Sequence, residues 1–377
     1  MADRDSEILA RLGPSVGSVE AWDSLAPADP FMARAFLALL EDSDSVGGHS
    51  GWTPAPILID DADGSLAAAA PAYLKAHSQG EYVFDHGWAE AWQRAGGEYY
   101  PKLQIAVPFT PVPGRRLLGT RPQALIAAAE AITVQNKLSS AHATFIAPEE
   151  VAEVEACRWL IRDGIQYHWF NRDYASFDDF LGALASRKRK VIRKERAAAR
   201  EGLEFIALRG TEIGPREWAA MWRFYQDTGS RKWGRPYLTR AFFEGLGAAL
   251  GDRVLLLLAI HDGDPIAGAL NLIGDDTLYG RYWGCDREVP FLHFELSYYQ
   301  AIDWAIEHGL KSVQAGAQGE HKLARGYEPV VTHSAHFLPN PDFRRAVANF
   351  VEGEREAVRH ELEALRGMLP YRRSGSA

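Results

Sequence analysis

The stretch that decides the fold lies between residues 277 and 338 and contains TLYGRYWGC (277–285), FLHFE (291–295) and AGAQGEHKLARGY (315–327). Glycines, aromatic residues and ionisable groups are unusually dense there. Glycine lets another backbone or a ligand come close to the chain. Polar groups that fall between apolar runs can converge at the mouth of a sheet. We therefore expect this stretch to form the active centre.

Length and composition set the outer limits. The chain has 377 residues, of which 47% are hydrophobic, and this size suits two domains. Its net charge of −9 argues against a large basic surface that binds nucleic acid non-specifically. Two cysteines make no disulfide framework, which fits a reducing compartment. No apolar run reaches the ~18 residues of a membrane span, and the acidic N-terminus lacks a signal core. We expect a cytoplasmic protein without a membrane span.

Hydrophobic periodicity gives the same general order in both halves of the chain: a helix, a hairpin, a strand, a helix, a strand, a helix or a loop, and a strand. The first half predicts a hairpin, a strand, a helix, a strand, a helix and a strand, at 57–74, 102–109, 122–136, 143–146, from 148 to 164, and 167–170. The second half predicts three meandering strands, an amphipathic helix, two strands and a last helix, at 254–261, 266–273, 277–285, 292–308, 311–317, 331–338 and 343–369. These patterns predict an α/β protein with mixed sheets flanked by helices.

Several short sequence segments resemble those of the FemAB-like branch of the GNAT acyltransferase superfamily, and more narrowly those of a bacterial family of peptidoglycan biosynthesis or recognition. They are Ser45–Gly47 with Gly51–Pro54, Pro71–Lys75, Tyr99–Gln104, Val107–Pro111, Gly280–Gly284, Phe291–Glu295 and Gly316–Lys322. The resemblance extends from about residue 20 to residue 345. It implies two tandem GNAT-like domains, at 1–170 and 171–340, and a C-terminal helix, 341–377, that packs back on the first domain.

The resemblance also implies a reaction. Characterised FemAB-like proteins move an aminoacyl group from aminoacyl-tRNA onto an amine of a peptidoglycan precursor. We therefore expect an acyltransferase that acts by direct attack of an amine, with no covalent intermediate and no metal. No permanently bound cofactor is expected; the donor would be acyl-CoA or aminoacyl-tRNA, and the acceptor a small molecule or peptide that carries an amine. The alternative is a non-catalytic GNAT scaffold that binds a peptidoglycan fragment or peptide.

Three residues are the catalytic candidates. Family members typically carry a lysine late in the second domain after a phenylalanine, whereas here His321 precedes Lys322. An attacking amine must lose a proton, which a carboxylate can accept, so Glu320 is the expected base and Glu295 a second candidate. Lys322 would stabilise the developing oxyanion. If 320–322 continued a strand, Glu320 and Lys322 would share one side. An ordinary charged loop end explains the spacing equally well.

The substrate-binding candidates surround these residues in the sequence. They are Arg281, Tyr282, Trp283, His293, Gln318, His321 and Arg325, together with Trp233 and Arg235 of a loop that could form a lid. Arginine near aromatic side chains suits a phosphate or a carboxylate. A half-buried strand with a surface arginine is nearly as common.

Four other sequence features are weaker indications of function. The basic residues between 187 and 200 could bind tRNA phosphates, but a solvated helix face is more common. Gly316–Lys322 lacks the ending of a P-loop. His333 and His336 would point to opposite faces of a strand, which argues against a zinc site. Cys285 fits packing better than a nucleophilic role.

Overall fold

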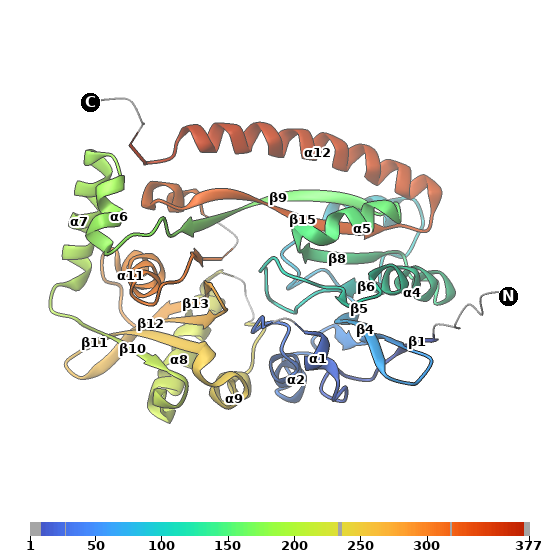
Figure 1. The fold of residues 1–377 in the computed structure, drawn as a ribbon, viewed down its shortest axis with the longest axis horizontal. Coiled ribbons are helices and arrows are strands. Elements are labelled where there is room, and N and C mark those ends of the chain that lie inside the picture. Colours follow the sequence, from blue (N-terminus) through green and yellow to red (C-terminus); the bar gives the residue numbers. More distant parts are fainter. Residues whose placement is uncertain (1–8, 27, 233–235, 317–318, 373–377) are drawn as a thin grey trace. The chain divides into compact units, whose positions relative to one another are not determined.

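The chain divides into two compact units in a computed structural model that describes residues 9–26, 28–232, 236–316 and 319–372. Unit 1 comprises Met1–Gly164 and Val331–Arg359, and unit 2 comprises Ile165–Val330 and His360–Ala377. Three elements have residues in both units: β9 (Leu160–Phe170), β15 (Glu328–Phe337) and α12 (Pro341–Gly367). Figure 1 shows the course of the chain. Each unit is described separately below.

Unit 1 contains two sheets. Its remaining strands are β1 (Leu9–Leu12), β2 (Trp52–Pro54), β3 (Ile57–Asp60), β4 (Leu66–Ala70), β5 (Ala72–Lys75), β6 (Lys102–Ile105), β7 (Leu118–Gly119) and β8 (Ala141–Ile146). Its helices are α1 (Trp22–Leu25), α2 (Arg34–Asp42), α3 (His86–Arg94), α4 (Pro122–Gln135) and α5 (Val151–Ala156). Strands β1, β3, β4 and β7 form an antiparallel sheet, while β2, β5, β6, β8 and the 331–337 part of β15 form a mixed one.

The mixed sheet of unit 1 has one apolar face and one polar face, because side chains alternate along each strand. Leu103 and Ala141 are neighbours in register on the apolar face, and both are fully buried. This face packs on α4 through Leu125, Ile126 and Ala129. On the opposite face the register aligns Gln104, His142 and His336, which are also buried. Both faces are therefore covered, and the polar one must satisfy its groups internally.

The first part of α12 belongs to unit 1. Phe343, Val347 and Val351 follow a helical stripe and are buried in one cluster with Trp88 and Tyr99. The ring of Phe343 stacks on Trp92, with centroids 4.6 Å apart. Residues 331–340, assigned to the second domain from sequence, also lie in unit 1, since β15 pairs with β8. Residues 360–377 belong to unit 2, where Leu365 joins the core.

Unit 2 is built on a meander. Its remaining strands are β10 (Glu204–Arg209), β11 (Val254–His261), β12 (Asp264–Ile273), β13 (Thr277–Cys285) and β14 (Ser312–Gln314). Its helices are α6 (Phe177–Ala183), α7 (Ser186–Arg200), α8 (Pro215–Lys232), α9 (Arg240–Leu250), α10 (Leu292–Phe294) and α11 (Gln300–Glu307). Strands β10 to β13 pair antiparallel, β13 pairs parallel with β14, and β14 pairs antiparallel with β9.

Helices cover both faces of the sheet of unit 2. A Cβ atom at Gly284 of β13 would lie 2.0 Å from the carbonyl oxygen of Phe224 on α8, so only glycine allows this helix to approach so closely. On the other face, Leu255 and Leu257 of β11 share one core cluster with Ile302 of α11 and Phe180 of α6. The predicted α/β class, with mixed sheets flanked by helices, is confirmed. Among the described residues, no helix is long and apolar enough to cross a membrane.

The composition of unit 1 predicts how fragments will fold. Residues 1–164 alone lack Ala335, Phe343 and Val347, so they leave the apolar face and the α12 contact surface incomplete. A Cβ atom at Gly164 would lie 3.1 Å from Thr332 Oγ1, so a short Gly-Ser linker can join residue 164 to residue 331. We predict a cooperative urea transition for residues 1–164 joined to 331–359, and none for residues 1–164 alone. Equal cooperativity of both fragments would contradict this prediction.

Candidate functional site

The candidate site of unit 2 lies where two strands separate. Strands β13 and β14 pair over three residues each, Thr277–Tyr279 and Ser312–Gln314, after which β13 continues to Cys285. A cavity of about 130 Å³ opens at this point, bordered by Gly280 on one side and by Ala315 and Gly316 on the other. We call it the notch. A Cβ atom at Gly280 would lie 3.5 Å from Asn271 Oδ1, so a larger residue would reduce the space.

A π-helical turn contributes the third wall of the notch. Residues Glu295–Tyr299 form this turn between α10 and α11, and Ser297 and Tyr298 line the notch. Such turns widen a helix by one residue and are frequent at functional sites. The sequence analysis predicted one uninterrupted helix over 292–308. The π turn changes which side chains face the sheet, and this is why Ser297 was not expected at the site.

Three polar atoms of the notch residues are buried without a hydrogen-bond partner in the described part of the chain. They are Asn271 Oδ1, Ser297 Oγ and Trp283 Nε1. Asn271 uses its amide nitrogen for the carbonyl oxygen of Ala269, at 3.0 Å, and keeps its oxygen as a spare acceptor. Burying an unsatisfied polar group costs about 1–3 kcal/mol. Such atoms commonly mark the place of a ligand or water, so this site can both donate and accept hydrogen bonds.

Lys322 is the strongest chemical feature of the site. Its side chain is buried, and Nζ donates a hydrogen bond of 2.6 Å to the carbonyl oxygen of Gly316, which borders the notch. Among the described side chains, no carboxylate forms an ion pair with Lys322. Burial lowers the pKa of Lys322 to about 7. At neutral pH a large fraction of this amine is therefore uncharged and able to accept a proton.

The segment around Lys322 differs locally from the prediction. Residues Glu320–Arg325 form a 3₁₀ turn and not the continuation of a strand, so the expected alternation of sides does not apply. His321 is exposed, and its Nε2 lies 2.8 Å from the hydroxyl oxygen of Tyr298. His293 lines the notch as well, with its ring centroid 4.8 Å from that of Trp283 and 6.3 Å from that of His321. The structure therefore places His293 in the wall of the notch and His321 in contact with Tyr298, which also lines it.

Two other predicted residues are engaged in buried ion pairs. Glu295 is fully buried and accepts hydrogen bonds from the guanidinium group of Arg196, at 3.1 Å and longer, and from Gln300 Nε2, at 2.8 Å. Arg325 binds both carboxylate oxygens of Glu195, at 2.9 Å, and stacks 3.4 Å over the ring of Phe294. These contacts join α7 to the turns beside the notch. They favour a positioning role over proton transfer.

The remaining candidates divide into two groups. Arg281, Tyr282 and Trp283 line the notch from β13, and the Arg281 guanidinium carbon lies 5.3 Å from the ring centroid of Tyr282. The other predicted residues, Gln318, Trp233 and Arg235, lie outside the described residues, as does the side chain of Glu320.

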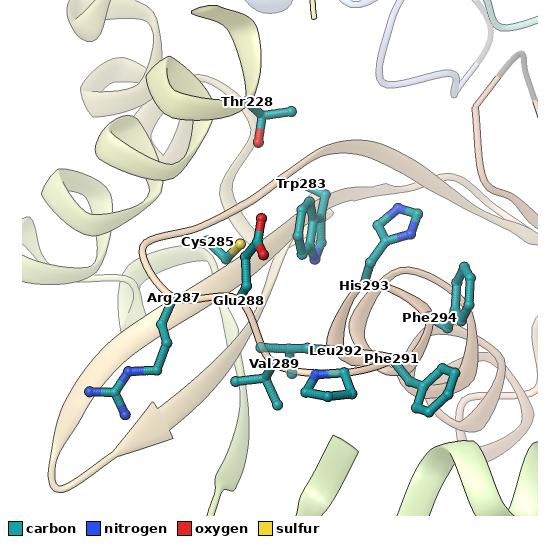
Figure 2. Close-up of a pocket in the computed structure, with 11 residues that line it drawn as sticks. Thr228, Trp283, Cys285, Arg287, Glu288, Val289, Phe291, Leu292, His293 and Phe294 are labelled. Atoms are coloured by element: carbon teal, nitrogen blue, oxygen red, sulfur yellow. The ribbon is translucent and has the colours of Figure 1, made fainter. Parts of the chain in front are cut away.

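A larger cavity adjoins the notch. Its volume is about 590 Å³, and Trp283 and His293 line both cavities. Most of its other lining residues are apolar or neutral, among them Cys285, Val289 and Leu292. Figure 2 shows Thr228 of α8 facing this group from the far side and the Arg287 side chain pointing away from it. We call this cavity the apolar chamber.

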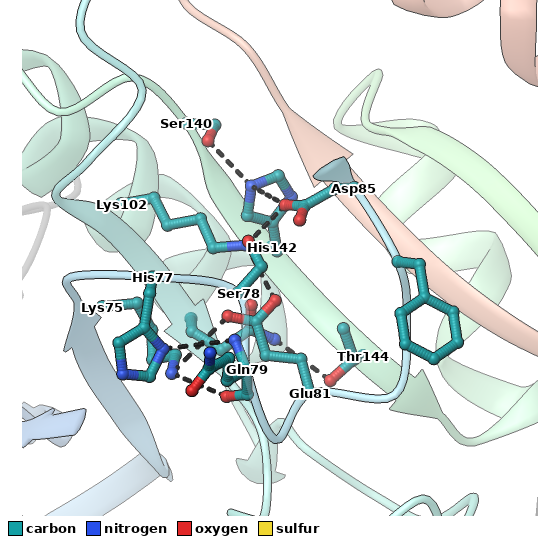
Figure 3. Close-up of polar contacts among 12 residues, drawn as sticks. Lys75, His77, Ser78, Gln79, Glu81, Asp85, Lys102, Ser140, His142 and Thr144 are labelled. Carbon is teal, nitrogen blue, oxygen red and sulfur yellow. Dashed lines mark hydrogen bonds and ion pairs between the residues drawn. The ribbon is translucent and has the colours of Figure 1, made fainter. Parts of the chain in front are cut away.

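The polar face of the unit 1 sheet carries a buried charge cluster, shown in Figure 3. Lys102 is fully buried, and its Nζ donates hydrogen bonds to Asp85, Glu81 and Ser78, at 2.5, 2.7 and 3.0 Å. Although burial opposes ionisation, Lys102 and its neighbours hold the pKa of Asp85 well below its usual range. The fully buried Lys75 lies 3.7 Å above the ring of Trp52. Burial lowers the pKa of Lys75 to about 7 and raises that of Glu81 to about 7.

Two histidines extend the cluster. His142 Nδ1 lies 2.7 Å from His336 Nδ1, and His142 Nε2 lies 2.7 Å from Ser140 Oγ and 3.3 Å from the hydroxyl of Tyr99. Burial lowers the pKa of His142 to about 3, so both rings are neutral at pH 7. Tyr99 donates its proton to Asp85, and its oxygen can accept one from His142 Nε2. His336 would then donate from Nδ1 to His142.

The sequence contained a signal for this cluster. Lysine and glutamine alternate with apolar residues at 102–104, as do tyrosine and lysine at 73–75. Only the strand register shows that these side chains share one face. Several of the sequence segments that carry the family resemblance contribute residues to this face, including Pro71–Lys75 and Tyr99–Gln104. Among the described residues, no group of three His, Cys, Asp or Glu side chains could hold a metal ion.

The cluster predicts a large and specific loss of stability. Lys102→Met removes the cation that neutralises Asp85 and Glu81, so we predict a loss of about 3–5 kcal/mol in the free energy of unfolding, measured by urea denaturation. The control is Lys311→Met, since Lys311 is exposed and lies 3.5 Å from Asp276, where surface pairs contribute about 0–1 kcal/mol. Adding Asp85→Asn and Glu81→Gln to Lys102→Met should recover part of the loss. Equal effects of the two lysine variants would contradict the assignment.

The chain is similar to one protein family and to several solved structures. A profile of the FemAB_like family, described as peptidoglycan biosynthesis/recognition, matches residues 16–373. No curated protein matches the chain. Among solved structures, FemX is 13% identical over 79% of this chain and 91% of its own, with a TM-score of 0.49. A tandem GNAT protein from the clavulanic acid pathway is 13% identical over 89% and 99%, with a TM-score of 0.46.

A conserved protein of unknown function from Bacteroides thetaiotaomicron VPI-5482 is 12% identical, covers 88% of this chain and 99% of its own, and has a TM-score of 0.53. This last likeness supports a shared fold over most of both chains. The family match covers nearly the whole sequence and agrees with the family resemblance found in the sequence. The chain belongs to the FemAB-like family of peptidoglycan biosynthesis or recognition.

Proposed function

We propose that unit 2 transfers an acyl or aminoacyl group onto an amine acceptor by direct attack at the notch, and that the acceptor is a cell-wall precursor. One observation carries this proposal: Lys322, a buried amine with a pKa of about 7, is anchored to Gly316 at the edge of the notch. A protein gains no stability from a buried amine that has no carboxylate partner among the described side chains, because desolvation of its charged form is costly. Family membership supports the same reaction class.

Burial changes the role that we assign to Lys322. From the sequence, Lys322 was expected to stabilise the oxyanion and Glu320 to act as the base. A general base works best when its pKa lies near the working pH, and Lys322 meets this condition. Its Nζ donates to Gly316, and the lone pair of the neutral amine remains to accept a proton from the acceptor ammonium group.

The reaction then balances without a covalent intermediate. The acceptor ammonium gives a proton to Lys322, and the freed nitrogen attacks the carbonyl carbon of the donor ester or thioester. A C–N bond forms, the tetrahedral oxyanion collapses, and the C–O or C–S bond to the donor breaks. A proton released from the new amide nitrogen goes to the leaving oxygen or sulfur. Lys322 is then deprotonated by solvent before the next turnover.

Two notch groups are placed to stabilise the oxyanion. Ser297 Oγ and Trp283 Nε1 can both donate a hydrogen bond, and neither has a partner in the described structure. Asn271 Oδ1 can accept a hydrogen bond from the attacking amine. Loss of one oxyanion donor typically costs on the order of 100-fold or more in turnover.

The role of Lys322 predicts a pH profile and an arginine test. Because the neutral amine is the active form, kcat/KM should rise with pH through about 7 and then level off. Lys322→Ala should lose about 100- to 10,000-fold in rate. Lys322→Arg should be equally inactive, since a guanidinium stays protonated. The assay is mass change on amine acceptors incubated with acetyl-CoA, longer acyl-CoAs or charged tRNAs.

Contrary results would reassign the site. An active Lys322→Arg enzyme with no pH dependence near 7 would restore the oxyanion role and make Glu320 the base, and Glu320→Gln would then abolish transfer. Loss of activity in Cys285→Ser, with an acyl-enzyme seen by mass spectrometry, would replace direct attack by a thiol nucleophile. If no donor supports transfer although peptidoglycan fragments bind, the binding function would hold instead.

Charge reversals on helix α7 can distinguish a tRNA donor from an acyl-CoA donor. Lys190 and Arg193 are exposed on it, whereas Arg196 is engaged with Glu295. If the donor is aminoacyl-tRNA, we expect Lys188→Glu, Lys190→Glu and Arg193→Glu together to abolish tRNA binding and its salt dependence. The control reverses Arg216, Arg223 and Lys311, which are exposed in the same unit. Absence of tRNA binding by the wild type would favour acyl-CoA.

A further inference from the structure

We propose that the apolar chamber holds the hydrocarbon body of the transferred acyl group, so that the donor carries a long or bulky apolar acyl chain rather than an acetyl or a charged aminoacyl group. This inference rests on the proposed transfer at the notch and names the class of its substrate.

Position is the first argument. The chamber and the notch share Trp283 and His293 as lining residues. Trp283 also carries one of the polar atoms without a partner in the described structure. A donor whose carbonyl lies in the notch would therefore extend its acyl chain directly into the chamber.

Size is the second argument. The notch, at about 130 Å³, suffices for a reacting carbonyl and a small substituent. The chamber, at about 590 Å³, falls within the range of about 300–1,000 Å³ that is typical of ligand pockets. An acetyl group would leave this second space empty, whereas a long acyl chain would occupy it.

The lining is the third argument. Cys285 and Leu292 are buried, and Val289 is half-buried. The charged lining residues, Arg287 and Glu288, are both exposed, and Figure 2 shows the Arg287 side chain directed away from the chamber. A charged acyl group would have to give up its hydration without a buried counter-charge among the described lining residues, which is costly. A hydrocarbon chain loses nothing on entering and gains by leaving water.

The rim supplies an independent observation. Phe291 lines the chamber with φ at +63°, a left-handed conformation that is rare for a large side chain, and its side chain is 41% exposed. Strained backbone of this kind clusters at ligand-binding sites. An aromatic ring held at the entrance would cover the chain of a bound acyl group.

The test uses the full-length protein and N-acetylcysteamine thioesters of acetate, butyrate, octanoate and dodecanoate, with no amine acceptor present. Binding is measured by calorimetry. We expect affinity to rise roughly fourfold for each methylene that enters the chamber. We also expect a negative heat-capacity change, the mark of apolar burial. Equal affinity for acetate and dodecanoate would overturn the inference.

Matched variants locate the bound chain. Val289→Trp should lower dodecanoyl affinity at least tenfold and leave butyryl affinity unchanged, because the indole would take up part of the chamber that only the longer chain reaches. Val191→Trp is the control, on the exposed face of α7. Phe291→Gly, which suits a positive φ and should fold normally, should also weaken dodecanoyl binding. Equal affinities of wild type, Val289→Trp and Phe291→Gly would place the chain elsewhere and overturn the inference.

The design separates this inference from the proposed function. Lys322→Ala should abolish transfer, whereas the variant should still bind long-chain thioesters more tightly than short-chain ones. Chain-length-dependent binding without transfer from any donor would contradict the proposed function and leave the chamber assignment intact. Transfer of acetyl as fast as dodecanoyl, with no preference in binding, would contradict the chamber assignment and leave the proposed function intact.

Discussion

Strands β13 and β14 run parallel and pair over only three residues, and the functional architecture of unit 2 depends on this short contact. A parallel pair needs a crossover, here the chain through α10, the π turn and α11, so these elements must lie against the same strands. Beyond the last pair the strands separate, and their backbone groups lose each other as partners. The gap becomes a site because Gly280, Ala315 and Gly316 leave it open and Lys322 is fixed at its edge.

Unit 1 contains the same arrangement in a closed form. There β6 pairs parallel with β8, and α4 lies between them in the sequence. The corresponding face, however, is filled by Lys75, Lys102 and His142 and covered by the segment that carries Glu81 and Asp85. One unit thus pairs its buried Lys102 with its own carboxylates, and the other leaves a lysine without one among the described side chains. Charge balance, more than backbone topology, separates the two units.

Sequence patterns predicted the elements well and their partners poorly. The meander, the α/β class and the importance of residues 277–338 follow from local periodicity and from the family phrases. The π turn at 295–299 and the 3₁₀ turn at 320–325 do not, because a shift of one residue in a helix leaves no mark in composition. The burial of Lys322, which decides its protonation, depends on packing from distant segments. Pairing of β8 with β15 joins residues that lie far apart in the sequence.

The division of the sequence between the units has a consequence for synthesis in the cell. Residue 164 leaves the ribosome long before the rest of unit 1, which resumes at residue 331, about 170 residues later. At translation rates of about 5–20 residues per second, the first segment waits for roughly ten to thirty seconds. Throughout that interval the edge of β8 and the apolar surface that later receives Phe343 and Val347 stay uncovered. The nascent chain therefore exposes an unpaired strand edge and apolar surface during this interval, which are the features that make folding intermediates prone to aggregation.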